Sequence, residues 1–179
     1  MTTGLLLAAG AGARMGTPKA LVHDPDGTSW LRRSVHVLTQ GGCQRVYVVL
    51  GAAAEEARPL LAGLPVEVVV AEDWADGMGA SLCAGLAAIG PRGAVLVSLV
   101  DLPDVGPEVA ARVLATGAGL ARATYDGRPG HPVLIGADHL EPLMATLHGD
   151  VGARGYLEAH DVALVECGDL ATGVDVDRR

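Results

Sequence analysis

The chain has 179 residues, of which 50% are hydrophobic and 19% charged, a composition typical of one globular domain rather than a disordered chain. Its formal net charge of −8 argues against a nucleic-acid-binding surface, because phosphate backbones attract a basic face. The three cysteines, Cys43, Cys83 and Cys167, form no C-x-x-C pair, so neither zinc nor a disulfide framework is indicated. No apolar run reaches the length of a membrane span and no secretory leader is apparent, so we expect a cytoplasmic protein without a membrane partner.

The first half of the chain alternates predicted strands and helices. The apolar run 4–9 is typical of a central strand that is buried on both faces. Two further strands are predicted at 46–50 and 66–70, with helices at 28–40, where Thr28 is the expected N-cap, and at 55–61. This β-α-β-α-β order implies a parallel sheet with right-handed crossovers.

The second half continues with a helix, on which Leu82, Leu86 and Ile89 share one face, and a strongly apolar strand at 94–100. A helix is predicted at 107–114, followed by strands at 120–125, 131–135 and 162–165, the first two flanking a turn-rich connection. We therefore predict an α/β fold over residues 1–179: a single-domain, Rossmann-like three-layer sandwich whose sheet is mostly parallel with an antiparallel element.

The first strand leads into the densest chemistry of the sequence, the loop Leu7-Ala8-Ala9-Gly10-Ala11-Gly12-Ala13-Arg14-Met15-Gly16-Thr17-Pro18-Lys19. Its glycines allow the backbone to approach a ligand closely, and consecutive N–H groups in such a turn form a cradle for anionic oxygens. Arg14 and Lys19 add two positive charges, and a guanidinium suits phosphate oxygens. The loop therefore predicts a polyphosphate site.

Two common phosphate loops do not match. The dinucleotide fingerprint G-x-G-x-x-G would need a glycine where Met15 stands, and an acidic residue after the second strand, where Gly51 stands. The P-loop pattern would need a glycine five positions after Gly10 or Gly12, and there is none. An oxidoreductase that binds a nicotinamide dinucleotide is therefore disfavoured.

Asp101 follows the strand at 94–100, at the edge where open α/β sheets bind ligands. Mg²⁺ prefers one or two carboxylates together with substrate phosphate oxygens. Asp101 is thus the candidate metal ligand beside the polyphosphate loop. Asp104, in the same Asp-Leu-Pro-Asp segment, is interpreted as a turn residue.

The loop motif, from Leu7 to Leu21, resembles the signature of the nucleotidyltransferases that act on the molybdenum cofactor, within the wider sugar-nucleotide transferase group. The resemblance implies that the loop wraps a nucleoside triphosphate and that Arg14 and Lys19 hold its phosphates. It also implies that Gly79 and Ser81 contact the base and ribose, although Ser81 also suits the first turn of a helix. The implied nucleotide-binding set is Leu7, Ala8, Ala9, Gly10, Gly12, Arg14, Lys19, Gly79 and Ser81, with Arg14, Lys19 and Asp101 as the catalytic residues.

The same resemblance extends to the second half of the chain. Asp-x-Pro at Asp101 is similar to the family's metal motif, and a C-terminal Asp-x-Asp implies a second metal ligand, Asp175, with Asp177 as the alternative. The segments around His131 and Arg154 are similar to the family's acceptor-facing region, so these two residues are candidates for binding the acceptor. A histidine before a proline can equally be structural.

The implied reaction moves CMP from CTP to molybdopterin and releases pyrophosphate, with Mg²⁺ as cofactor and a molybdenum hydroxylase as a possible recipient of the product. Ala9 before Gly10 favours cytidylyl over guanylyl transfer within this resemblance. Three alternatives remain open: another triphosphate such as GTP, another phosphorylated acceptor, and a non-catalytic accessory protein that delivers the cofactor.

Overall fold

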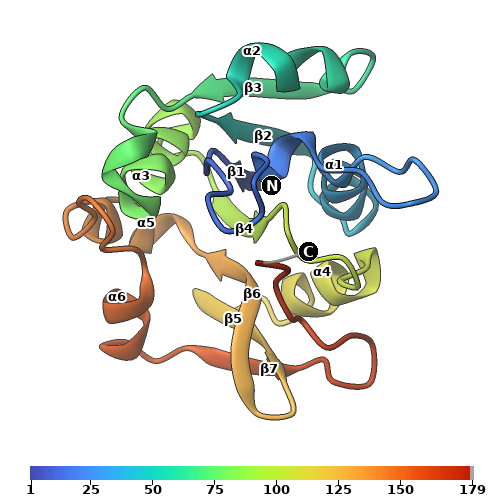
Figure 1. Ribbon diagram of the computed structural model, residues 1–179. Helices are drawn as coiled ribbons and strands as arrows, with labels where there is room; N and C mark the ends of the chain where they lie inside the picture. The colour runs from blue at the N-terminus through green and yellow to red at the C-terminus, as the bar shows by residue number, and fades with distance from the viewer. Residues whose placement is uncertain (178–179) are drawn as a thin grey trace.

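The computed structural model describes residues 1–177, which form one seven-stranded sheet in the order β3-β2-β1-β4-β6-β5-β7 (Figure 1). The strands are β1 (Thr2–Ala8), β2 (Arg45–Leu50), β3 (Val66–Val70), β4 (Ala94–Leu99), β5 (Leu120–Tyr125), β6 (Arg128–Ile135) and β7 (Ala163–Glu166). The pairs β1–β2, β1–β4, β2–β3 and β5–β7 are parallel, whereas β6 runs antiparallel to β4 and β5. The predicted mixed sheet, mostly parallel with an antiparallel element, is confirmed.

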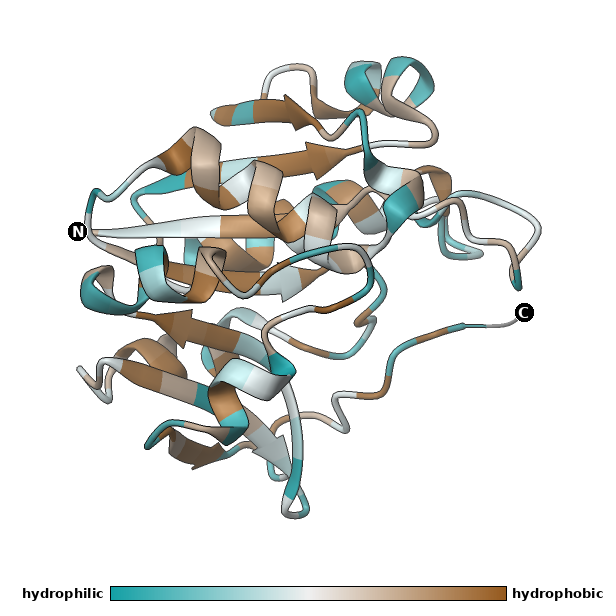
Figure 2. Cartoon of the chain, turned by 90° about the vertical axis from the view of Figure 1, so that its left-hand side faces the viewer, coloured by the Kyte–Doolittle hydropathy of each residue, from teal (hydrophilic) through white to brown (hydrophobic). Residues whose placement is uncertain are grey.

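Helices cover both faces of the sheet, which makes three layers (Figure 1). One face carries α1 (Trp30–Gln40), α2 (Ala54–Ala57) and α4 (Pro107–Leu114), and the other carries α3 (Met78–Ile89), α5 (Ala137–Met144) and α6 (Arg154–Glu158). Single 3-10 turns lie at Lys19–Leu21, Arg58–Leu61 and Trp74–Asp76. The strands are predominantly apolar along their length (Figure 2), and Leu5 and Leu6 of β1 are fully buried. None of the helices within residues 1–177 combines the length and hydropathy of a membrane span.

Two local predictions need correction. The N-cap of α1 is Ser29 rather than Thr28: the Ser29 hydroxyl accepts a hydrogen bond from the Arg32 N–H at 3.3 Å, whereas Thr28 lies in the preceding turn. Strand β6 begins at Arg128 rather than His131, because the connection from β5 is a two-residue turn. In that turn Asp126 and Gly127 have φ of 49° and 76°, as expected for an Asp-Gly hairpin.

The segment after β7 returns across the molecule to the carboxyl end of β4 (Figure 1). The Asp104 carboxylate accepts hydrogen bonds from the Thr172 N–H and hydroxyl, both at 2.6 Å, so Asp104 does more than close its own turn. Gly173, with φ of 63°, packs against Tyr125, whose ring would lie 2.1 Å from a Cβ at this position. The Val176 N–H donates to the Asp101 carbonyl at 3.0 Å, which fixes the end of the segment beside β4.

Candidate nucleotide and metal site

The glycine-rich loop folds back on itself directly after β1. Gly12 has φ of 63°, and a Cβ there would lie 2.0 Å from the Thr17 carbonyl oxygen, so this position requires glycine. The N–H groups of Met15 and Gly16 both donate to the Gly12 carbonyl at 2.9 Å. Pro18 then precedes the short turn that begins at Lys19. The loop therefore brings Arg14 and Lys19 back to the strand end from which it started.

A cleft of about 350 Å³, here called the first cleft, opens at the carboxyl ends of β1 and β4. This edge of a parallel sheet is where α/β proteins bind ligands. The first cleft is lined by every loop residue in the predicted nucleotide-binding set, namely Leu7, Ala8, Ala9, Gly10, Gly12, Arg14 and Lys19. Ser81, Asp101 and Asp177 also line it.

Lys19 lies between two carboxylates in the first cleft. Its ammonium donates hydrogen bonds to Asp101 Oδ2 and, at 2.7 Å, to Asp177 Oδ1. Burial acts to lower the pKa of Lys19, but the hydrogen bonds and charges of Asp101 and Asp177 outweigh it and raise the pKa above its ordinary value. Arg14 is more exposed and lies 3.4 Å from Asp177 Oδ2. Both cations are thus paired with carboxylates that lie beside the loop.

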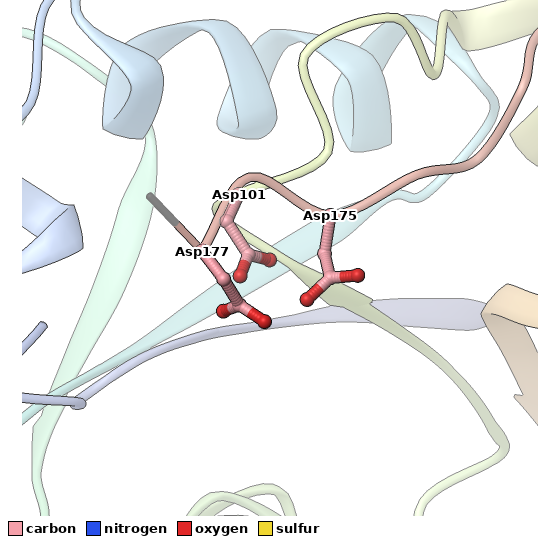
Figure 3. A group of neighbouring side chains, drawn as sticks. All are labelled: Asp101, Asp175 and Asp177. Atoms are coloured by element: carbon pink, nitrogen blue, oxygen red, sulfur yellow. The ribbon is translucent and has the colours of Figure 1, made fainter. Parts of the chain in front are cut away.

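Three carboxylates lie close together, two of which, Asp101 and Asp177, line the first cleft (Figure 3). Asp101 comes from the end of β4, and Asp175 and Asp177 come from the C-terminal segment, with oxygen atoms all within 4.8 Å of one another. Asp101 Oδ1 is buried and has no hydrogen-bond partner among residues 1–177. Burial, followed by the hydrogen bond and charge of Asp177, raises the pKa of Asp175, whereas the hydrogen bond from Lys19 lowers the pKa of Asp177.

This donor set fits a divalent cation. Mg²⁺ and Mn²⁺ favour carboxylate oxygens, and a buried carboxylate oxygen without a partner is a position that a cation would satisfy. The sequence left Asp175 and Asp177 as alternatives for the second ligand, and the structure brings both into the group with Asp101. All three residues could therefore contribute to one metal site.

The two residues predicted from the start of α3 are placed differently. Ser81 is buried and lines the first cleft. Gly79 instead packs against the backbone that precedes α6: a Cβ at Gly79 would lie 2.3 Å from the Val151 carbonyl oxygen. Trp74 and Met78 line the first cleft without having been predicted to do so. The nucleotide contacts of Gly79 and Ser81 remain predictions.

A second cleft of about 220 Å³ lies next to the first and shares Leu7 and Met78 with it. It contains His131 and Arg154, the two candidates for acceptor binding. Burial, together with the charge of Arg122, lowers the pKa of His131 to about 4, so its imidazole is neutral near pH 7. The Arg154 side chain is 87% exposed and donates to Glu158 at 2.8 Å. These two residues line the second cleft and are absent from the lining of the first.

Arg122 also lines the second cleft, and the sequence interpretation missed it. The signal was present: in Leu120-Ala121-Arg122-Ala123, arginine occupies the same face of a predicted buried strand as Leu120. A charge on an inward-facing strand position is unusual enough to mark a candidate site.

The fold and the first cleft define a nucleotidyltransferase class of protein: a glycine-rich loop after the first strand faces carboxylates at the end of a neighbouring parallel strand. A family model for the MobA-like NTP transferase domain matches residues 4–164, and the chain belongs to this family. The resemblance seen in the loop is thereby confirmed at the level of the NTP transferase family. Neither CTP nor the molybdenum cofactor is specified by this match.

Similar proteins and structures cover almost the whole chain. Nicotine blue oxidoreductase from Paenarthrobacter nicotinovorans is 37% identical over 187 aligned positions, which cover 98% of this chain and 91% of that protein. The crystal structure of Rv0371c from Mycobacterium tuberculosis H37Rv superposes with a TM-score of 0.85 at 33% identity, covering 99% of this chain and 92% of that one. A complex of Rv0371c with manganese gives a TM-score of 0.76 at 30% identity, covering 98% and 93%.

Proposed function

We propose that this protein is a divalent-metal-dependent nucleotidyltransferase that moves a nucleoside monophosphate from a triphosphate to a phosphorylated small molecule. The observation that carries the proposal is the convergence of Lys19, from the glycine-rich loop, with Asp101 and Asp177 in the first cleft. A charged group suited to phosphate thus lies next to carboxylates that suit a cation. Membership of the NTP transferase family and the manganese bound by the similar Rv0371c both support it.

In this reaction a phosphate oxygen of the acceptor attacks the α-phosphorus of the triphosphate. A new phosphoanhydride bond forms, the bond from the α-phosphorus to the β-phosphate oxygen breaks, and pyrophosphate leaves with the electron pair. Arg14 and Lys19 hold the β- and γ-phosphates and neutralise the pyrophosphate as it departs. Mg²⁺ held by Asp101, Asp175 and Asp177 would neutralise charge on the α-phosphate. A phosphate acceptor is already anionic near pH 7, so no general base is needed.

The triphosphate and acceptor to try first are CTP and molybdopterin. They follow from the resemblance of the loop to molybdenum cofactor nucleotidyltransferases, with Ala8-Ala9-Gly10 favouring cytidylyl transfer. Another base such as GTP, or another phosphorylated acceptor, would use the same first cleft and metal ligands. A non-catalytic accessory protein would retain nucleotide binding without turnover.

A second candidate function is the oxidoreductase activity in the name of the relative from Paenarthrobacter nicotinovorans. The observation in its favour is 37% identity over 98% of this chain. It would require a reducing cofactor, and the loop departs from the dinucleotide fingerprint at Met15. We therefore rank this activity below nucleotidyl transfer and include it in the test.

The test compares thermal unfolding with Mg²⁺ and CTP, GTP, ATP or UTP, and separately with NADH or NADPH. A ligand at one hundred times its dissociation constant stabilises the folded state by about 2.7 kcal/mol. Stabilisation by a triphosphate, followed by pyrophosphate release when molybdopterin is added, is the expected result. Stabilisation by NADH or NADPH alone would favour the oxidoreductase, and triphosphate binding without pyrophosphate release from any acceptor tried would favour the accessory protein.

A further inference from the structure

The second cleft has an apolar floor in which one charged side chain stands. Val97 of β4 pairs with Val133 of β6, and Val133 pairs with Arg122 of β5. Side chains at paired positions project from the same face of a sheet, so these three form one row across three strands. Val97 and Val133 belong to the apolar core on that face, and Ile135 and Leu157 extend the apolar lining. Arg122 is the charged end of an otherwise hydrophobic row.

Within residues 1–177 the Arg122 guanidinium has no carboxylate partner. One terminal nitrogen donates to the Gly130 carbonyl at 3.2 Å, while Nε is shielded from solvent and has no hydrogen-bond partner among residues 1–177. No ion pair within these residues includes Arg122. Burial, followed by the charge of Arg154, lowers the pKa of Arg122. A partly buried cation with a shielded Nε and no carboxylate partner within residues 1–177 is destabilising unless a ligand supplies the countercharge.

The other polar groups of the second cleft do not neutralise Arg122. Asp150 lines the second cleft and packs against Gly77, where its Oδ1 would lie 2.1 Å from an added Cβ, and it forms no ion pair with Arg122 within residues 1–177. Arg154 is already paired with Glu158 at the exposed rim. His131 carries no charge near pH 7. Arg122 is thus the inward cation of a cleft whose lining is mostly apolar, which favours a ligand with an anionic group on an apolar body.

We propose that the second cleft binds the acceptor and that Arg122 binds an anionic group of that acceptor, remote from the reacting phosphate. Lys19 and Asp101 line only the first cleft and Arg122 lines only the second, while Leu7 and Met78 line both. The acceptor would thus lie across Leu7 and Met78, with its reacting phosphate toward the first cleft. Resting on the proposed nucleotidyl transfer, this assigns the substrate class: a small molecule with an apolar body and an anionic group at each end.

The test measures binding of simple probes without any nucleotide. Benzoate and phenyl phosphate carry the anion on an apolar ring, and benzamide is the uncharged analogue of benzoate. Dissociation constants are obtained from ¹H–¹⁵N NMR titrations, in which the amide signals of Val97 and Val133 report on the second cleft. The variants are Arg122→Met, which replaces the cation by an apolar side chain, and Arg128→Met, a control on the exposed end of the same hairpin.

We expect the better anionic probe to bind the wild type about tenfold or more tightly than benzamide, since a hydrogen bond to a charged group contributes that much. Arg122→Met should lose this advantage, and Arg128→Met should stay within about twofold of wild type. A preference between benzoate and phenyl phosphate identifies the anion as carboxylate or phosphate. Equal binding by the two variants, or no preference for the anions over benzamide, would overturn the proposal.

Unfolding midpoints without ligand separate a binding role from a structural one. Because Arg122→Met completes the apolar row and removes an unpaired cation, its midpoint should be higher than that of wild type. A lower midpoint would assign Arg122 a structural role and overturn the proposal. If Arg122→Met does not fold, Arg122→Gln repeats both measurements. Because no nucleotide is used, a failure of nucleotidyl transfer would appear only in the triphosphate assay and leave this outcome readable.

Discussion

The two halves of the sheet handle charge in opposite ways. In the parallel half, β3-β2-β1-β4, the first cleft pairs the charge of Lys19 with those of Asp101 and Asp177. In the other half, β6-β5-β7, the second cleft leaves Arg122 without a carboxylate among residues 1–177. In a paired site such as the first cleft, two ligands of opposite charge can replace the internal partners. A phosphate would take the place of the carboxylates as the partner of Lys19, and a metal ion would take the place of the Lys19 ammonium beside Asp101 and Asp177. An unpaired site needs its ligand to supply the missing charge.

The largest expected effect is on metal binding in the parallel half. Asp101→Asn removes the charge of one of three converging carboxylates and replaces one of its two oxygens by an amide NH2 group. Loss of an outer-shell group typically weakens metal binding by about 10- to 100-fold, so loss of this ligand should weaken Mn²⁺ binding by at least about a hundredfold. Titration calorimetry with MnCl₂ measures it, and pyrophosphate release should fall in parallel.

Asp138→Asn is the matched control for Asp101→Asn, because Asp138 is an exposed aspartate at the start of α5. This variant should bind Mn²⁺ as the wild type does. Unchanged Mn²⁺ affinity in Asp101→Asn would exclude the three-carboxylate metal site. It would also exclude the replacement of the Lys19 ammonium by a metal ion in the first cleft.

Lys19→Met should change the affinities for nucleotide and metal in opposite directions. Affinity for the magnesium complex of CTP, or of the preferred triphosphate, should fall by about 10- to 100-fold, as expected when a hydrogen bond to a charged group is lost. Mn²⁺ alone should bind at least as tightly as to wild type, since Asp101 and Asp177 lose their competing ammonium. Calorimetry measures both constants, with Arg45→Met, at the opposite end of the sheet, as control. If Lys19→Met lowered the affinity for both the nucleotide and Mn²⁺, the metal ion would not compete with the Lys19 ammonium for Asp101 and Asp177.

The difference between the two clefts also explains which features could be predicted from the sequence alone. The loop residues of the first cleft are consecutive, and a glycine pattern with Arg14 and Lys19 indicates their chemistry directly. Asp101 follows a strand of unmistakable hydrophobicity, so its position at the sheet edge was predictable. The succession of strands along the chain was predictable because each strand is a distinct apolar run, and the antiparallel element was indicated by the turn-rich connection between the strands at 120–125 and 131–135.

Other features depend on contacts between distant segments. Asp175 and Asp177 could not be separated by sequence, because they lie on an irregular segment whose position depends on Asp104 and Thr172 rather than on strand alternation. Gly79 reads as a loop glycine, yet the backbone at Val151 occupies the space beside it. The alternation of its strand marks Arg122 as inward-facing, but its place beside Val133 in the second cleft depends on the pairing of β5 with β6, which the local pattern does not give.

In the half containing β5–β7, stability should depend on acid through Glu166. Its carboxylate accepts hydrogen bonds from the N–H groups of Gly127, Gly168 and Asp126 and from the Thr124 hydroxyl, and these lower its pKa from 4.5 to about 2. Because the folded pKa lies below the unfolded one, this stabilisation is present above about pH 4.5 and is lost as pH falls toward 2.

Glu166→Gln, which cannot ionise, should lack this part of the acid sensitivity. Thermal unfolding by circular dichroism, from about pH 5 to about pH 2.5, should show a smaller fall in midpoint for Glu166→Gln than for wild type. Glu158→Gln, on the exposed surface of α6, should follow the wild-type curve. Identical slopes for Glu166→Gln and wild type would mean that the β5–β6 turn is not stabilised by this carboxylate.

The smallest effect is expected at Arg154, the residue first suggested as an acceptor contact. Its side chain is 87% exposed and already paired with Glu158, and such surface pairs contribute only about 0–1 kcal/mol. Arg154→Met should therefore change the dissociation constant of the preferred anionic probe by less than about threefold, while Arg122→Met changes it by about tenfold or more. The NMR titration used for Arg122 measures both in one series. If Arg154→Met lost as much affinity as Arg122→Met, the acceptor charge would lie at the exposed rim beside an already paired cation. The second cleft would then bind its ligand at a cation that already has a carboxylate partner, as the first cleft does. The difference between a cleft with paired charges and a cleft with an unpaired Arg122 would no longer hold.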